Sequence, residues 1–352
     1  MKVYAMVGIG KADWVEKPKP KCGPLDALVR PLVLAPCSSD THTIKGVLGV
    51  LQDRGLGHEG TGIVDEVGEL VKDFKPGDRV IIPAITPDWL SEEAQDGWQQ
   101  HTHGMLGGYK FTTQKDGVFS EFIHINEADG NLAHLPEGVD PEVGAMLSDM
   151  TPTGFHGAEL ANVRFGDDVA VIGIGPVGLM AVQGAVLRGA GRIFAVGSRP
   201  NCVEIAKEFG ATHIIDYHNG DIDKQILDLT DGKGVDRVIL AGGNQETFTQ
   251  SIKIMKPGGT LGNINYFDSL EPLKIPMLEW GMGMGHKDIR GGLMPGGRER
   301  MRRLANMVVA GRINPGRLVT HRYEGFDKIP EAVQVMSDKP KDLIKPVVIC
   351  EW

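Results

Sequence analysis

The sequence lacks the features of several protein classes. No low-complexity tract interrupts it, and its 41% hydrophobic and 24% charged residues are near the globular average, which excludes disordered and fibrous proteins. Basic residues do not predominate, because 37 Lys and Arg stand against 46 Asp and Glu and give a formal charge of -9. A net negative charge disfavours binding to nucleic acid or to anionic lipid. We therefore expect a soluble folded protein with no nucleic acid and no membrane as partner.

Long hydrophobic runs are also missing. The most apolar stretch, residues 169–182, is broken by glycines and Pro176 and is shorter than the roughly 20 residues of a membrane-spanning helix. A charged residue, Lys11, interrupts the first segment of the sequence. This segment therefore lacks the apolar run found in secretory signals. We therefore expect a cytoplasmic location.

Cysteine is scarce, and the sequence has no C-x-x-C pair. The four cysteines, Cys22, Cys37, Cys202 and Cys350, lie far apart, which excludes a disulfide framework and a cysteine-rich structural zinc site. A lone cysteine is usually a small buried hydrophobe, and this is our interpretation of all of them except Cys37.

Glycine, in contrast, is abundant, and the length indicates two domains. The 48 glycines suggest many tight turns and favour an α/β enzyme, and 352 residues exceed one typical domain. Short Val- and Ile-rich runs bounded by Gly and Pro predict a mostly-β domain over residues 1–152, with a long polar excursion at 86–116 on the surface or at a subunit contact. Strands alternating with helices predict a doubly wound parallel sheet over 153–293. A helical run and a final apolar strand assign 294–352 back to the first domain.

A glycine pattern in the second domain predicts a dinucleotide site. Gly173, Gly175 and Gly178 follow an apolar strand and open a helix, which is the context that the G-x-G-x-x-G pattern requires. The first glycine allows a tight turn, the second lets the backbone reach a pyrophosphate, and the third lets helix and strand pack closely. The pyrophosphate would lie at the helix N-terminus, beside Pro176 and Val177.

The residues after the next strand favour NADP over NAD. NAD-binding units place an acid on the ribose 2′-hydroxyl roughly 20 residues past the last glycine. This sequence has Gly197, Ser198 and Arg199 there, so the acid is missing and two donors suited to a 2′-phosphate are present. We also assign Asn265 to cofactor binding.

The first domain contains residues that are competent to bind zinc. Cys37, His58 and Asp149 are each suitable ligands, and a catalytic zinc takes three protein ligands and keeps one open position. Their spacings of 21 and 91 residues carry no information by themselves.

Longer strings resemble a known family. GHEGTGIV at 57–64, GDRV at 77–80 and GIGPVG at 173–178 resemble the zinc-containing medium-chain alcohol dehydrogenases. The sequence is especially similar to NADP-dependent secondary-alcohol dehydrogenases of anaerobic bacteria and protists. The strings that carry this are APCSSDTH at 35–42, PAITPDW at 83–89, TGFHGAEL at 153–160, IGIGPVGLMAV at 172–182, AVGSRP at 195–200 and DLIKPVV at 342–348.

The resemblance implies a mostly-β, GroES-like catalytic domain, a Rossmann domain and a site. Its zinc ligands fall on Cys37, His58 and Asp149, with Glu59 able to approach the metal. Residues 86–116 contain no cysteine, so one catalytic zinc and no structural zinc are implied. The resemblance also places Tyr217 beside the 2′-phosphate and implies a homotetramer.

A proton path and a substrate pocket complete the prediction. Ser39 can hydrogen-bond the alcohol, and His42, titrating near neutral pH, can pass its proton to solvent. By resemblance the pocket walls are Ala84, Ile85, Tyr109, Tyr266, Leu293 and Met294. Relatives usually carry tryptophan and cysteine at positions 109 and 294, which leaves the stereochemical preference open.

The sequence thus predicts an enzyme that oxidises small secondary alcohols to ketones, reversibly, by hydride transfer to the nicotinamide C4 of NADP(H). An apolar pocket disfavours sugars, whose hydroxyls it cannot satisfy. Two alternatives are a zinc-free ketone or quinone reductase of the same fold, and a nucleotide-binding protein that has lost catalysis.

Overall fold

The chain forms two compact units in the computed structural model, which describes residues 1–269 and 271–351. The first unit is built from both ends of the chain, Met1–Pro152 and Pro295–Trp352, and the second unit is Thr153–Met294. We expected the return to the first domain at residue 294, but Met294 stays with the second unit, whose last strand ends only three residues earlier. Within the described residues, no helix is long and apolar enough to cross a membrane.

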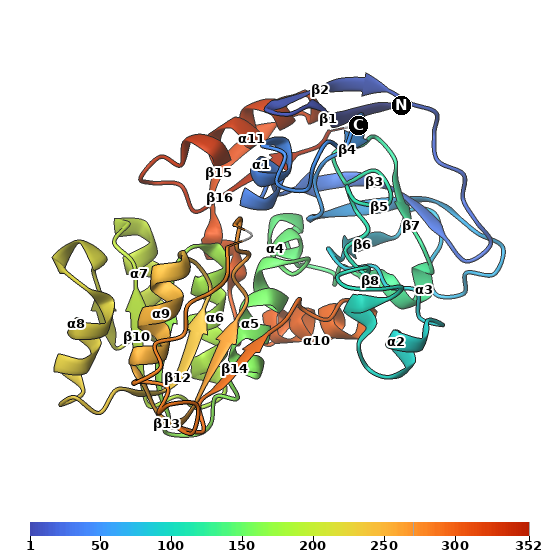
Figure 1. The fold of residues 1–352 in the computed structure, drawn as a ribbon. Helices are drawn as coiled ribbons and strands as arrows, with labels where there is room; N and C mark the ends of the chain where they lie inside the picture. The colour runs from blue at the N-terminus through green and yellow to red at the C-terminus, as the bar shows by residue number, and fades with distance from the viewer. Residues whose placement is uncertain (270, 352) are drawn as a thin grey trace. The chain divides into compact units, whose positions relative to one another are not determined.

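The first unit is mostly β (Figure 1). One sheet has the order β2-β1-β4, and a larger one has the order β15-β16-β3-β5-β6-β8, with β7 also paired to β3. The strands are β1 (Lys2–Gly8), β2 (Lys11–Glu16), β3 (Ala27–Leu34), β4 (Arg54–Gly55), β5 (Gly60–Val67), β6 (Arg79–Ile82), β7 (Ile123–Ile125), β8 (Ala133–His134), β15 (Val319–Glu324) and β16 (Lys345–Ile349). The helices are α1 (Ser38–Ile44), α2 (Glu92–Gln95), η1 (Gln99–His101), α3 (Ala128–Asn131), α4 (Pro141–Met146), α10 (Arg298–Val309), η3 (Pro315–Leu318), η4 (Phe326–Lys328) and α11 (Ile329–Asp338).

The pairing of β3 with β5 is the centre of the larger sheet. Pro31, which has no N–H to donate, lies at an irregularity in the β3–β5 register, where a proline is tolerated. Gly62 lets the two backbones approach, because a Cβ there would lie 2.4 Å from the carbonyl oxygen of Arg30. This tight pairing fixes the start of β5, directly after His58 and Glu59.

The second unit contains one six-stranded parallel sheet in the order β11-β10-β9-β12-β13-β14. Its strands are β9 (Asp168–Ile172), β10 (Arg192–Val196), β11 (His213–Ile215), β12 (Val235–Leu240), β13 (Met255–Asn263) and β14 (Asp288–Gly291). Its helices are α6 (Pro176–Leu187), α7 (Pro200–Glu208), η2 (Tyr217–Asn219), α8 (Ile222–Leu229) and α9 (Gln245–Lys253), and α5 (Met150–Leu160) begins in the first unit and continues into the second. The strands alternate with helices, as the sequence predicts for a doubly wound sheet.

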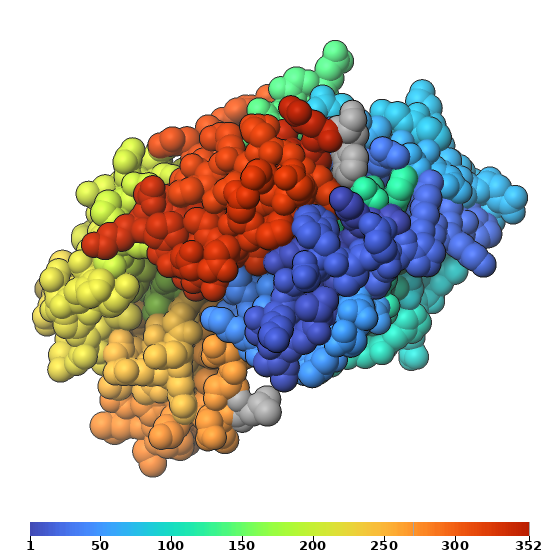
Figure 2. All heavy atoms as spheres, turned by 90° about the horizontal axis from the view of Figure 1, so that it is seen from above, coloured from blue at the N-terminus to red at the C-terminus, as the bar shows by residue number. Residues whose placement is uncertain are grey.

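The C-terminal segment is an integral part of the first unit. β16 inserts between β15 and β3, and Ile329 and Val333 of α11 join the same buried core as Tyr4 and Met6 of β1. Figure 2 shows the C-terminal segment, in red, against the N-terminal segment, in dark blue. The final strand therefore completes the sheet that carries the first unit's candidate site.

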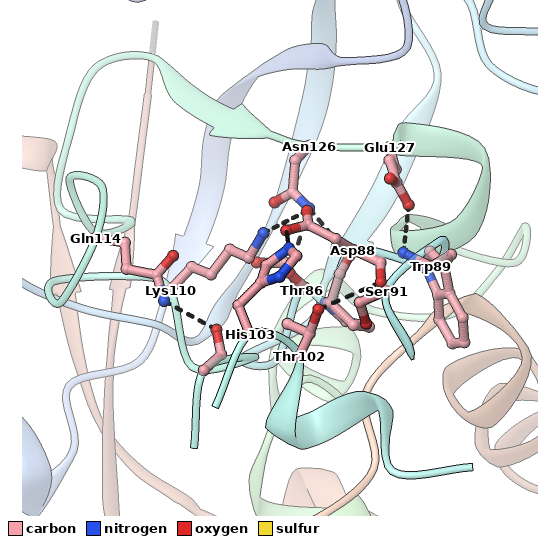
Figure 3. A network of polar contacts seen from close by, with 12 residues as sticks. Thr86, Asp88, Trp89, Ser91, Thr102, His103, Lys110, Gln114, Asn126 and Glu127 are labelled. Atoms are coloured by element: carbon pink, nitrogen blue, oxygen red, sulfur yellow. Dashed lines mark hydrogen bonds and ion pairs between the residues drawn. The ribbon is translucent and has the colours of Figure 1, made fainter. Parts of the chain in front are cut away.

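A polar network organises the surface excursion at 86–116 (Figure 3). The Asp88 carboxylate pairs with Lys110, lies 2.8 Å from His103 Nε2 and accepts a bond from Asn126 Nδ2 at 3.2 Å. Beside it, Trp89 N donates to Glu127 at 2.7 Å. Ion pairs and hydrogen bonds thus connect the excursion to the body of the first unit.

Candidate metal centre and nucleotide site

Four side chains with metal-binding atoms converge in the first unit. Cys37, His58, Glu59 and Asp149 each offer one ligand atom, and these atoms all lie within 4.8 Å of one another. His58 and Glu59 are buried, at 2% and 0% exposure, while Cys37 and Asp149 are half-buried. The structure therefore brings together all four residues that we expected to hold zinc, from the starts of α1, β5 and α5.

Asp40 ties two of these segments together. One of its carboxylate oxygens accepts a bond from the backbone N–H of Cys37 at 2.8 Å, and the other accepts from Gly57 N–H at 3.1 Å and lies 3.5 Å from His58 Nδ1. Our sequence reasoning missed this residue. The available signal was an acid at the third position of a helix that follows Cys37, where a carboxylate often caps the helix.

The two ring nitrogens of His58 face different partners. Nε2 lies 3.6 Å from both Glu59 and Asp149, within the cluster, whereas Nδ1 lies 3.1 Å from the hydroxyl oxygen of Tyr109. The Tyr109 ring also meets the imidazole edge-on, with 5.3 Å between centroids. A partner on the second nitrogen fixes the orientation of a metal-binding histidine, so Nε2 is the atom available to a metal.

Lys345 of β16 forms a buried ion pair with Glu59. Its Nζ lies 2.7 Å from Glu59 Oε1, and the two side chains are 1% and 0% exposed. Glu59 Oε2 is buried and has no hydrogen-bond partner in the described structure. Sequence reasoning also missed Lys345, although a lysine within the apolar run LIKPVVIC should have suggested a buried partner.

The charges of the cluster shift its protonation equilibria. Burial by itself raises the pKa of Cys37, but the Lys345 ammonium and His58 outweigh it and lower that pKa to about 7. Burial raises the pKa of the Glu59 carboxyl well above its usual value, while Lys345 acts in the opposite direction. Such shifts are typical of functional sites, where anionic groups are crowded together and desolvated.

The two residues of the predicted proton path lie on α1, next to the cluster. The Ser39 hydroxyl donates to Cys37 Sγ at 3.1 Å. His42 is half-buried one helical turn further on, and residues three apart on a helix are surface neighbours. A serine hydroxyl thus reaches the sulfur atom of the cluster, with a titratable group beside it.

A cleft of about 670 Å³ in the second unit collects most of the predicted cofactor residues. It is lined by Gly173, Gly175, Gly197, Ser198, Arg199 and Tyr217 among others. Pro176, Val177 and Gly178 do not line it. Gly178 has a packing role instead, since a Cβ there would lie 1.9 Å from Gly173 O. Asn265 is also outside the lining but bonds to the carbonyl oxygen of Gly243, which is part of it.

Gly197 has a packing role, beyond leaving room for a phosphate. A Cβ at residue 197 would lie 2.3 Å from Ile174 Cγ1, so packing against Ile174 requires a glycine there. A Cβ built on Gly175 would lie 3.8 Å from Arg199 Nη2, which places this guanidinium at the glycine turn. The turn itself has Gly173 at φ +89°, a conformation that favours glycine.

Sequence reasoning missed one wall of the cleft. Gly242, Gly243, Asn244 and Thr247 line it, at the carboxyl end of β12 and the start of α9. β12 pairs with β9 in the sheet, so the ends of the two strands lie side by side. The available signal was the glycine pair that follows the strand VDRVIL after one alanine.

The predicted substrate-pocket walls fall in two groups. In the first unit, Ala84 and Ile85 are buried, Ala84 N–H donates to Ser148 O next to Asp149, and Tyr109 contacts His58. The other three residues belong to the second unit: Tyr266, Leu293 and Met294. The first group therefore lies around the cluster, and the role of all six in substrate binding stays a prediction.

Family models match both parts of the chain. Residues 23–137 match the alcohol dehydrogenase GroES-like domain, and residues 176–310 match the zinc-binding dehydrogenase domain. The chain belongs to the zinc-binding alcohol dehydrogenases. This confirms the predicted family and the predicted fold class, a GroES-like domain joined to a Rossmann domain.

Relatives of this dehydrogenase cover nearly its whole length. The NADP-dependent isopropanol dehydrogenase of Entamoeba histolytica is 60% identical over 99% of this chain and 95% of its own. The enzyme of the same name from Thermoanaerobacter brockii is 60% identical over 99% of both chains. Among solved structures, a zinc-dependent alcohol dehydrogenase of Streptococcus pneumonia has a TM-score of 0.89 and 32% identity, with 100% of this chain and 99% of that chain covered.

Proposed function

We propose that this protein is an NADP- and zinc-dependent dehydrogenase that interconverts small secondary alcohols and ketones. The observation that carries the proposal is the buried convergence of Cys37, His58, Glu59 and Asp149. The names of the relatives, NADP-dependent isopropanol dehydrogenases at 60% identity, support the substrate class. A zinc-free reductase would not need this cluster of metal-binding side chains. A protein without catalysis would not need Ser39 beside the cluster.

The residues present fit a zinc ion. Thiolate sulfur, imidazole nitrogen and carboxylate oxygen are all donors that zinc accepts. Three anionic side chains, Cys37, Glu59 and Asp149, would balance the two charges of the ion together with the Lys345 ammonium. The unpartnered Oε2 of Glu59 is a fourth available donor atom. Cys37, His58 and Asp149 would hold the metal, with Glu59 next to it.

Each bound group supplies chemistry that the chain lacks. Zinc would polarise the alcohol oxygen, and the nicotinamide would accept hydride from the adjacent carbon. The chain's own part is to orient and to move the proton. Ser39 is placed to hydrogen-bond the alcohol hydroxyl, and His42 on the same helix to carry the proton toward solvent.

The cleft of the second unit supports NADP as the cofactor. The glycine turn at 173–175 leaves backbone free to approach a pyrophosphate at the start of α6. Ser198, Arg199 and Tyr217 line the part of the cleft that would receive the 2′-phosphate. The missing carboxylate after β10 removes the group that NAD enzymes use at this place.

Small substrates suit the walls around the cluster. Ala84 and Ile85 are short or aliphatic, and by resemblance we also assign Tyr266, Leu293 and Met294 to substrate binding. Such walls offer few hydrogen bonds to a polyol and suit propan-2-ol and acetone better than sugars.

We also propose a homotetramer with one zinc per chain and no structural zinc, acting in the cytoplasm. Self-association is supported by the sheet of the second unit, where β14 is an edge strand with one side unpaired. Nearby residues expose large apolar side chains, with Leu278 at 79% and Met284 at 78% exposure. Light scattering during gel filtration would test the number of chains.

The experiment for the whole proposal combines metal analysis with one assay. Zinc content per chain would be measured on purified enzyme, and the absorbance of NADPH followed with propan-2-ol and NADP. We expect about one zinc per chain and rapid reduction of NADP. Activity without zinc would favour the reductase alternative, and nucleotide binding without turnover would favour the inactive one.

A further inference from the structure

A second pocket lies in the first unit, apart from the metal cluster and made of other residues. Its volume is about 520 Å³. Its lining comes from the segment before β3, from the β4 region and from the chain around β7: Lys17, Pro20, Lys21, Gln52, Arg54, Lys115, Asp116, Phe122 and His124. Four of these residues are Lys or Arg and only one is acidic, in a protein whose formal charge is -9.

The one acidic residue of the lining already has partners. Asp116 lies 2.7 Å from Lys17 Nζ and also accepts a bond from Gly55 N–H at 2.8 Å. His124 already has a partner of its own, because its Nε2 lies 2.9 Å from Asp26. These contacts leave Lys21, Arg54 and Lys115 without an acidic partner.

Two of the three remaining cations have no partner at all among the described residues. No ion pair, hydrogen bond or ring contact engages the side chain of Lys21 or that of Arg54, although Arg54 is half-buried. Arginine elsewhere in the chain is commonly paired: Arg192 holds Asp168 through two nitrogens, and Arg322 holds Glu142 in the same way. Uncompensated positive charge at one concave place is the usual chemistry of an anion site.

Lys115 adds a third cation with only a neutral partner. Its Nζ donates to the amide oxygen of Asn126 at 2.9 Å and lies 4.5 Å above the Phe111 ring. Asn126 is in turn held by Asp88 in the network of Figure 3. Burial and the like charge of Lys110 lower the pKa of Lys115 to about 7, although Asp26 and Asp88 act against this. A bound anion would restore the charged form.

We propose that this pocket binds a small phosphate-bearing anion through Arg54, Lys21 and Lys115. Arginine binds phosphate oxygens as a fork and lysine binds them as a point charge, which suits a tetrahedral dianion. Gln52 and His124 supply further polar groups in the lining. The volume exceeds that of inorganic phosphate alone, so an organic phosphate ester fits as well as free pyrophosphate.

The test measures anion binding to the zinc-loaded enzyme saturated with NADP, so that the nucleotide cleft is already filled. Inorganic pyrophosphate and ribose 5-phosphate would be titrated by calorimetry. We expect binding to wild type, weakened about tenfold by Arg54→Gln and about hundredfold by Arg54→Gln with Lys21→Gln, since each charge-assisted contact contributes about 1.5 kcal/mol or more. Tighter binding of pyrophosphate would indicate a free phosphate as the ligand. Tighter binding of ribose 5-phosphate would indicate an organic ester.

Two controls make the result specific. Lys75→Gln removes one exposed lysine of the same unit outside the pocket, and Lys72→Gln removes another. Both should bind pyrophosphate like wild type. Absence of binding to wild type, equal affinity in the Arg54→Gln variant, or the same loss in Lys75→Gln would each overturn the proposal. Unchanged thermal unfolding of Arg54→Gln would show that its fold is retained.

Discussion

The nucleotide cleft and the metal cluster are built by opposite means. The cleft is lined largely by short runs of residues at the ends of neighbouring strands, among them 172–175, 196–199 and 242–244. The cluster is made of side chains from segments far apart, and its ion pair joins Glu59 to Lys345, 286 residues away. A site built from short local runs needs particular residues at particular local spacings, whereas a site built from distant segments needs only that the fold brings its side chains together.

The strongest test of this comparison removes one ligand of the cluster. Asp149→Ala should lose zinc and measurable activity, because it deletes a carboxylate donor whose oxygen lies 3.6 Å from His58 Nε2. NADPH binding, followed by its fluorescence, should stay within about twofold if the two sites are separately built. Glu137→Ala, an exposed carboxylate of the same unit, is the matched control. Full zinc content in Asp149→Ala would refute the ligand assignment.

The buried ion pair of the cluster should carry a large stability effect. Lys345→Met leaves the buried Glu59 carboxyl group without its partner, and removing one member of a buried pair costs about 3–5 kcal/mol. Denaturant unfolding of the two proteins would measure the difference. Adding Glu59→Gln to Lys345→Met should recover part of the loss. A variant as stable as wild type would mean that the pair contributes nothing.

We expect the next largest effect from substitutions in the proton path. Ser39→Ala should lower kcat about hundredfold, the lower end of the range for proton-transfer groups. His42→Ala, one step further along, should lower kcat less and should change its pH profile. Ser38→Ala, on the same first turn of α1, is the control and should be close to wild type. Wild-type kcat in Ser39→Ala across pH would exclude the path.

The cleft can be tested through cofactor preference. Arg199→Ala should reduce the preference of kcat/KM for NADP over NAD by about tenfold to hundredfold, the contribution of one charge-assisted contact. Gly197→Asp should reduce it further by repelling the 2′-phosphate. Retention of the full NADP preference in both variants would contradict the assignment.

Gly197→Asp needs its own control, because a Cβ at residue 197 would clash with Ile174. Gly197→Ala introduces the same clash without the charge. The difference between the alanine and aspartate variants therefore measures what the carboxylate group adds to the clash. Equal effects of the two would assign the role of this glycine to packing.

The smallest expected effect belongs to Tyr109. Tyr109→Phe removes the hydroxyl that faces His58 Nδ1 at 3.1 Å and keeps the ring. Loss of a partner behind a metal-binding histidine typically weakens metal binding, and we expect about tenfold here. Competition with a zinc-binding dye would measure the zinc affinity directly. An unchanged affinity would leave Tyr109 with a role in the pocket wall only.

The cleft and the cluster also differ in how far they could be predicted from the sequence. The turn at Gly173–Gly175 and the donors Ser198 and Arg199 were found because their roles depend on neighbours in sequence. The chain's own spacing did not identify the cluster, and only the family resemblance selected Cys37, His58 and Asp149. Asp40 and Lys345 were missed because their roles depend on contacts with other strands.

The position of Lys345 also has a consequence for how the protein is made. A ribosome releases Glu59 long before β16, so the carboxylate lacks its partner until a further 286 residues have been made. All residues of the second unit leave the ribosome before Lys345, so the cofactor domain can fold first, as domains generally do. The ion pair that holds Glu59 in the cluster can form only after β16 has been released. A chain terminated before β16 would thus contain all of the second unit but would leave the Glu59 carboxylate without its ammonium partner.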